Sequence, residues 1–127
     1  MKSLFFHIIY SISSIVFPSS PETQELESLS TEDFVLKASP LSTEPYANIK
    51  SLFNYHDPLI QKSLWELKYQ GNKKIAQTFG KLLYETLLDE LSDTLLFSNF
   101  DKPILIPLPL SKERRKERGW NQSEMLI

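Results

Sequence analysis

The sequence predicts an α/β domain, and three features that follow one another along the chain indicate this class. Two amphipathic helices are expected between residues 58 and 91. An apolar run at 104–110 follows them and has the composition of a buried strand. A basic loop and the start of another helix come directly after that run. This order is informative because α/β sheets bind ligands beyond the carboxyl ends of their strands.

The first helix has the clearest start in the chain. Asp57 can cap it, and Pro58 occupies the first helical position, where the missing N–H does no harm. Gly71 is expected to end it. Apolar residues follow at helical spacing, at Ile60, Leu64 and Leu67.

The second helix is predicted from Asn72, a capping residue, to about Leu91. One apolar face runs along it, through Ile75, Phe79, Leu82, Leu83 and Leu87.

Strands are expected on either side of the helix pair. The run "ILIPLPL" at 104–110 predicts a strand that Pro107 and Pro109 would end and stiffen. The stretch "IKSLFNY" at 49–55 is a weaker candidate, because its apolar and polar residues mix imperfectly.

Composition limits the classes of function. With 127 residues the chain holds one domain or less, and its net charge of −2 gives no overall attraction to nucleic acid. The absence of cysteine excludes disulfides, thiolate nucleophiles and cysteine-ligated zinc. The two histidines, His7 and His56, are far apart in sequence and have no ligand-like spacing.

The residues before the helix pair divide into two segments. Residues 1–17 predict an amphipathic helix that docks on a partner, with a short export signal as the alternative. Residues 18–48 carry four prolines and an excess of acids, which is typical of an irregular acidic connector. Residues 49–127 would then form the domain proper.

The stretch "SKERRKERGWNQ" at 111–122 concentrates the basic residues of the chain. Five basic and two acidic side chains give it a local charge of +3 and leave −5 for the rest. After it, Asn121 and Glu124 have the spacing of a capping box, so a helix starting there would point free N–H groups at the basic loop. Phosphate is the natural ligand, because the planar fork of Arg suits bidentate contact. The alternative is an exposed charged helix without a ligand, which composition alone favours.

Two segments of the chain resemble the ComF family of phosphoribosyltransferase-like proteins, which are linked to competence and DNA uptake. "IPLPLSKERRKERGWNQSEML" is similar to the family's "PVPL…R…RGFNQ…LA" segment. "LIQKSLWELKYQGNKKIAQTFGKLLYETL" is similar to its "LI…LKY.G……A..LG.LL" helices. The two segments together cover residues 55–127 in the order and at the spacing of the family.

The resemblance implies a type I phosphoribosyltransferase-like fold, a parallel sheet flanked by helices, with 104–110 as its first core strand. It implies that the loop after this strand faces the pyrophosphate of phosphoribosyl pyrophosphate. The phosphate-binding positions carried over are Arg114, Arg115, Arg118, Gly119, Asn121 and Gln122.

Individual roles also follow from the resemblance. Arg114 and Arg118 would contact phosphate, Gly119 would permit the turn, and Asn121 with Gln122 would cap the helix or order the loop.

Three further matched residues have a structural and a functional interpretation. Trp120 stands where the family usually has Phe, so packing is expected and stacking on a base is the alternative. Lys68 and Tyr69 match the "LKY" motif. The preferred interpretation is a helix end at which the charge of the lysine interacts favourably with the helix dipole, and the alternative is a ligand contact.

The chain departs from the family in two places. The region 18–48 lacks the four zinc-binding cysteines that family members commonly carry, so no zinc is expected. Ile127 precedes the family's phosphoribosyl pyrophosphate loop, so no catalytic residue is assigned and Mg²⁺ is expected only for a complete protein. The chain is therefore interpreted as the N-terminal part of a longer protein or the product of an interrupted gene.

Three hypotheses for function remain open, all with a cytoplasmic location. The first is a ComF-like protein that binds phosphoribosyl pyrophosphate or another phosphorylated ligand, for DNA uptake or nucleotide salvage. The second is a non-catalytic module that binds single-stranded DNA or a DNA-uptake helicase, with the N-terminal helix contacting a partner or a membrane. The third is a fragment without independent function.

Overall fold

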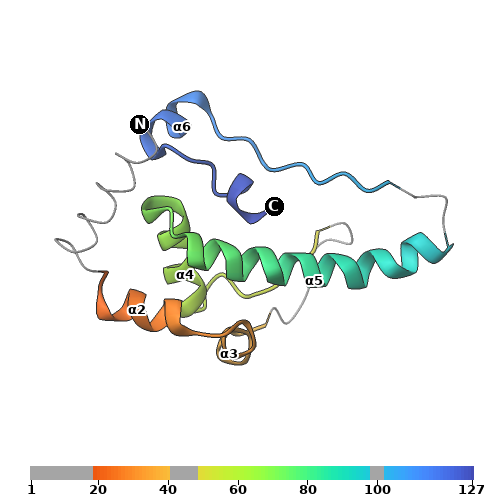
Figure 1. Ribbon diagram of the computed structural model, residues 1–127, viewed down its shortest axis with the longest axis horizontal. Helices are drawn as coiled ribbons and strands as arrows, with labels where there is room; N and C mark the ends of the chain where they lie inside the picture. The colour runs from red at the N-terminus through yellow and green to blue at the C-terminus, as the bar shows by residue number, and fades with distance from the viewer. Residues whose placement is uncertain (1–18, 41–48, 98–101) are drawn as a thin grey trace, which may run out of the picture.

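The computed structural model describes residues 19–40, 49–97 and 102–127, and helices make up most of these ranges (Figure 1). The predicted N-terminal amphipathic helix, 1–17, lies outside them. The elements in chain order are α2 (Pro21–Ser28), α3 (Thr31–Lys37), α4 (Pro58–Trp65), the π-helix η1 (Glu66–Gln70), α5 (Lys73–Phe97), α6 (Lys112–Arg118) and the 3₁₀ helix η2 (Glu124–Leu126). No helix in the described ranges is both long enough and apolar enough to cross a membrane.

The predicted α/β fold, with the parallel sheet of a type I phosphoribosyltransferase, is wrong for the described residues. They contain no strand and no sheet, and their one bridge is an isolated antiparallel pair, Pro40 with Phe53. The strand expected at 49–55 is thereby reduced to a single bridging residue.

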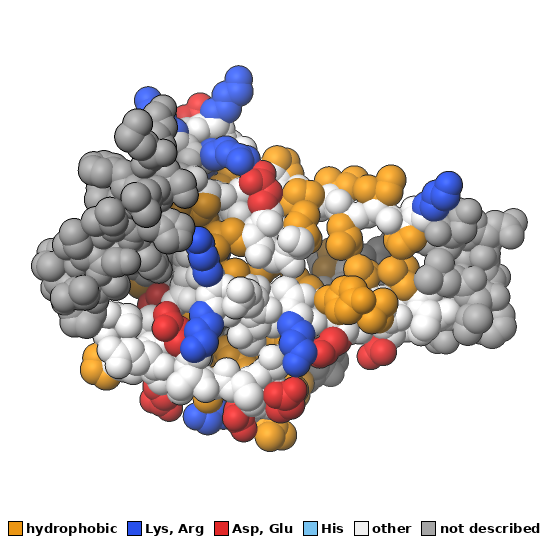
Figure 2. All heavy atoms as spheres, in the orientation of Figure 1, with side chains coloured by type: hydrophobic (Ala, Val, Ile, Leu, Met, Phe, Trp, Pro, Cys, Tyr) orange, Lys and Arg blue, Asp and Glu red, His pale blue; other side chains and the backbone are white. Residues whose placement is uncertain are grey.

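The segment 104–110 is not the buried strand that was predicted. Ile104 and Ile106 are 81% and 83% exposed, so no layer covers this face. The physical reason lies in its prolines, since Pro107 and Pro109 have no N–H to donate to a ladder. In Figure 1 the segment leads back past α5 toward α6, and Figure 2 shows apolar side chains along it.

The predicted start of the first helix is confirmed. The Asp57 carboxylate accepts hydrogen bonds from the backbone N–H groups of Leu59 and Ile60, at 2.8 and 3.4 Å. A second oxygen of the same carboxylate accepts from the backbone N–H of Ser39 at 2.7 Å. This second bond ties the start of α4 to the end of α3. The Ser39 side chain also donates to the Asp57 carboxylate, and this bond has the largest effect on its pKa. Because all these hydrogen bonds stabilise the ionised form, they lower the pKa of Asp57.

The first helix ends at Gly71, as predicted, but its last turn is a π-helix. The backbone N–H of Gly71 bonds to the carbonyl of Glu66, five residues earlier. Gly71 has a φ of 60°, and a Cβ at this position would lie 3.1 Å from the Trp120 ring. Its conformation would strain any other residue, and the neighbouring indole would have to move slightly to admit a Cβ, so both favour glycine.

The second helix, α5, begins as predicted, because the Asn72 side chain accepts from the backbone N–H groups of Lys74 and Ile75. It continues beyond the expected end near Leu91, to Phe97.

The irregular conformation predicted for 18–48 is wrong for residues 21–28 and 31–37, which form α2 and α3. Ser20 and Ser30 cap the two helices, each accepting from the backbone N–H three residues later. The division of the chain into three segments remains a prediction.

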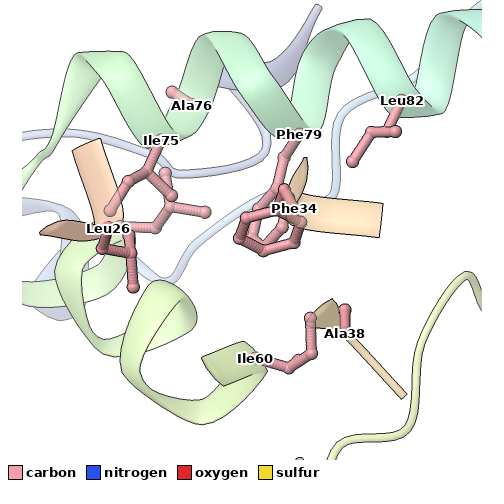
Figure 3. Close-up of a cluster of buried hydrophobic side chains, with 9 residues drawn as sticks. Leu26, Phe34, Ala38, Ile60, Ile75, Ala76, Phe79 and Leu82 are labelled. Atoms are coloured by element: carbon pink, nitrogen blue, oxygen red, sulfur yellow. The ribbon is translucent and has the colours of Figure 1, made fainter. Parts of the chain in front are cut away.

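The hydrophobic core lies between α5 on one side and α2, α3 and α4 on the other (Figure 3). Phe34 of α3 is 2% exposed and meets Phe79 of α5 edge to face, with ring centroids 5.3 Å apart. The short helices that were predicted to be irregular therefore supply central core residues, Leu26 and Phe34.

The end of the described chain packs back on α5 through η2. A Cβ at Gly80 of α5 would lie 2.9 Å from the backbone carbonyl oxygen of Leu126. The absence of a side chain at Gly80 lets the two backbones approach, and it fixes where the residues after α6 lie.

Candidate anion-binding groove

The basic stretch forms α6, a helix whose residues Lys112–Glu117 are exposed. The Ser111 hydroxyl accepts from the backbone N–H of Arg114 at 3.2 Å and caps its start. Gly119 ends it in the left-handed conformation, with a φ of 81°. The exposed charged helix considered from composition is therefore present, and the arrangement of its side chains decides whether it can also bind an anion.

A groove of about 500 Å³ lies between α6 and the end of η1. Three segments line it: the end of η1, the end of the segment 104–110, and α6 with its capping residue and the turn after it. The lining residues are Lys68, Tyr69, Leu108, Pro109, Leu110, Ser111, Arg114, Arg118 and Gln122. Three of the predicted phosphate-binding residues therefore share one concave surface: Arg114, Arg118 and Gln122.

Arg114 and Arg118 reach the groove together because residues four apart share one helix face. The Arg118 guanidinium lies over the Tyr69 ring, 5.2 Å from its centroid, and donates to the Gln122 side-chain oxygen at 3.2 Å. These contacts hold Arg118 across the groove from α6 to η1. No described residue forms an ion pair or hydrogen bond with the Arg114 guanidinium, so it is available to a ligand.

Arg115 does not line the groove. Its guanidinium donates two hydrogen bonds to the two carboxylate oxygens of Glu124, at 2.7 and 2.9 Å. The pair raises the pKa of Arg115 and lowers the pKa of Glu124, chiefly through these bonds. Arg115 therefore joins α6 to η2 and is not available to an anion.

Gly119 and Asn121 also lie outside the groove lining and hold its shape. Asn121 is 2% exposed. Its side-chain amide donates to the Leu108 carbonyl at 2.9 Å, and its side-chain oxygen accepts from the Ser123 N–H at 3.0 Å. One buried side chain thus connects the segment 104–110 to the turn after α6. A 3₁₀ helix, η2, stands where the sequence predicted a capped α-helix.

Trp120 packs, as expected. Its indole N–H donates to the Leu67 carbonyl at 2.9 Å, and its ring lies against Gly71. The bond fixes α6 and the following turn onto η1, so Trp120 positions the two walls of the groove relative to each other.

Lys68 and Tyr69 lie in the groove wall, although the sequence favoured a structural interpretation of both. The matched "LKY" motif named these residues, but nothing in it indicated that η1 is a π-helix or that α6 packs opposite. The groove contact depends on residues some fifty positions apart in sequence, which a local pattern cannot bring together.

The groove does not fit a resident metal ion. None of the described residues that line it is a carboxylate or a histidine. Across the described ranges, no group of three His, Cys, Asp or Glu side chains could hold a metal ion. Its positive lining instead suits an anion.

Comparison with known proteins identifies a curated relative of the chain. The chain is 32% identical over 77 residues to the competence protein ComFC of Bacillus subtilis (strain 168). This similarity supports a relationship to the ComF family. The match covers 61% of this chain and 29% of ComFC, so the chain spans less than a third of that protein's length. No family model matches the chain, and no solved structure matches it.

Proposed function

We propose that this chain is a competence-related, ComF-like protein whose groove binds a phosphorylated ligand, with the pyrophosphate group of phosphoribosyl pyrophosphate as the candidate. The observation that carries the proposal is the convergence of Arg114 and Arg118 on one groove without a carboxylate among its described lining residues. Guanidinium groups suit phosphate because they donate two parallel hydrogen bonds to it. In a transfer reaction the same two cations would stabilise the departing pyrophosphate.

The arrangement of α6 supports a specific site over general attraction. Arg115 lies next to Arg114 in sequence but is paired with Glu124, and Lys112 and Lys116 lie outside the groove lining. A ligand held by geometry would therefore depend on two of the five cations. An anion attracted only by net charge would depend on all five about equally.

Isothermal titration calorimetry with inorganic pyrophosphate tests the proposal. Replacing Arg114 or Arg118 with Ala should weaken binding by about tenfold or more, since each change removes a charge-assisted hydrogen-bond pair. Lys116→Ala removes the same charge from the same helix outside the groove and should leave affinity within about twofold of the wild type. Equal losses in all three variants, or no binding by the wild type, would contradict the proposal.

Single-stranded DNA is a second candidate ligand, favoured by an aromatic pair beside the groove. Trp65 and Tyr69 are 45% and 53% exposed, and their ring centroids lie 5.8 Å apart. Proteins that bind single strands combine cationic grooves with such rings. If the groove binds a DNA backbone, the double variant Arg114→Ala, Arg118→Ala should flatten the salt dependence of DNA binding, and an unchanged slope would exclude this candidate.

A further inference from the structure

We infer that the apolar segment 104–108 is a docking surface for a second copy of this chain, and that two copies meet there in antiparallel orientation about a two-fold axis. The inference does not depend on anion binding, because Ile104, Leu105 and Ile106 do not line the groove. It rests on the exposure of the segment, on its backbone and on the opposite charges at its two ends.

The segment presents a contiguous apolar surface to solvent. Ile104, Ile106 and Leu108 are 81%, 83% and 74% exposed, and Leu105 is 55% exposed. Figure 2 shows apolar side chains gathered along this part of the chain. Single apolar residues on a surface are normal, but four large ones within five positions form a patch, and such patches mark interaction sites.

The prolines of the segment restrict its backbone and limit how a partner can bind it. Ile106 and Leu108 each precede a proline, which biases both residues away from helix and toward extended backbone. Pro107 and Pro109 have no N–H to donate. The Leu108 carbonyl already accepts from the Asn121 side chain. A partner would therefore pack against the side chains rather than add a strand, and docking would order little backbone.

The two ends of the segment adjoin opposite charges. Residues 82–102, which include the second half of α5, contain five acidic residues and one basic residue, a net charge of −4. Residues 112–118, which form α6, contain five basic and two acidic residues, a net charge of +3. Figure 1 shows the end of α5 and α6 at opposite ends of the segment, so one copy cannot bring these charges together.

A second copy in antiparallel orientation satisfies both ends at once. With the two-fold axis at Ile106, Ile104 of each copy lies opposite Leu108 of the other, and each α6 lies beside the acidic end of the other α5. A parallel pair would place like charges together at each end. Two-fold symmetry also closes the assembly at two copies. An anionic membrane fits this surface less well, because it would repel the acidic end.

Sedimentation equilibrium of the full chain tests the docking surface. The wild type should dimerise with a dissociation constant of about 1–100 µM, as expected for a contact of limited area. Ile106→Glu should raise this constant by about tenfold or more, because the two-fold axis brings the two introduced carboxylates together. Leu36→Glu is the matched control, because Leu36 is also 83% exposed but lies on α3, across α5 from the segment in Figure 1. It should change the constant by less than about twofold, and thermal unfolding should be alike for the two variants.

An exchange of charges tests the antiparallel orientation. One variant, Asp89→Lys with Asp93→Lys, brings the net charge of 82–102 from −4 to 0. The other, Lys112→Glu with Lys116→Glu, brings the net charge of α6 from +3 to −1. Each variant alone should dimerise more weakly than the wild type, because both ends of its dimer are altered. A mixture of the two should associate more tightly than either alone, because one end of the mixed dimer combines an unchanged α5 with an unchanged α6.

Four results would overturn the inference. A wild type that stays monomeric at every concentration would mean that a second copy is not the partner of this surface. Species that grow beyond the dimer would exclude a closed two-fold contact. An equal loss in Leu36→Glu and Ile106→Glu would place the contact elsewhere, and a mixture that associates no more tightly than its components would exclude the antiparallel orientation. The proposed anion binding is measured separately and stands or falls independently of these results.

Discussion

Replacing Asn121 with Ala should destabilise the chain and disturb the groove, although Asn121 does not line it. Asn121 is 2% exposed, and its amide joins the Leu108 carbonyl to the Ser123 N–H. Leu108 belongs to the groove lining, and so does Gln122, the neighbour of Asn121. The Asn121 side chain therefore connects two segments that line the groove, the segment 104–110 and the turn after α6, without lining the groove itself.

The magnitude follows from the two hydrogen bonds. Each buried bond contributes about 0.5–1.5 kcal/mol net, so losing both should lower the free energy of unfolding by about 1–3 kcal/mol. Both partners are backbone groups that Ala cannot satisfy, which places the expected value in the upper half of this range.

Urea unfolding followed by circular dichroism measures this change. The midpoint should fall without a change in slope, because the surface exposed on unfolding is nearly unchanged. Gln122→Ala is the neighbouring control: its side chain accepts one bond at 3.2 Å in a partly exposed position, so the loss should stay below about 0.5 kcal/mol. If Asn121→Ala is as stable as Gln122→Ala, the buried link between the two segments does not exist as described.

Three other changes have defined outcomes. Gly80→Ala should destabilise the chain by about 1 kcal/mol or more in urea unfolding, since the clash with the Leu126 carbonyl outweighs the gain in helix propensity. Asp57 has a pKa below 3.8 because it accepts hydrogen bonds, led by that from Ser39, so its stabilising effect is present above about pH 4 and lost as the pH falls through the lowered pKa. Urea midpoints of Asp57→Asn measured from pH 6 downward should therefore show a smaller acid loss than the wild type. Arg115→Ala should leave pyrophosphate affinity within about twofold of the wild type by calorimetry, because Arg115 is paired outside the groove.

Each of these predictions has a result that would contradict it. A more stable Gly80→Ala variant would mean that η2 does not pack closely on α5. If the urea midpoint of Asp57→Asn falls with pH as steeply as that of the wild type, the Asp57 carboxylate does not stabilise the link between α3 and α4. A loss of affinity in Arg115→Ala equal to that in Arg114→Ala would mean that the helix acts through its total charge.

Local chemistry predicted the helix pair well. Asp57 with Pro58, Gly71 and Asn72 are residues whose own side chains or backbone freedom set a helix end, so their effect can be recognised without knowing the fold. Ser20 and Ser30 carried the same kind of signal before α2 and α3, but the surrounding prolines and acids led to the prediction of an irregular connector.

The prediction of a sheet was wrong for a different reason. The apolar run 104–110 predicts a strand only if another strand pairs with it, and pairing is a property of distant residues. Within the described ranges no strand does so, and the prolines of the run remove donors from it. The family resemblance indicated the loop after 104–110, but it did not distinguish Arg115 from Arg114, because that distinction depends on the position of Glu124.

The central claim is that an anion binds between η1 and α6, and nuclear magnetic resonance tests it most directly. A pyrophosphate titration should shift the side-chain Nε–H resonances of Arg114 and Arg118 and leave that of Arg115 nearly unchanged. Similar shifts at all three arginines, or shifts only at residues away from the groove, would contradict the claim.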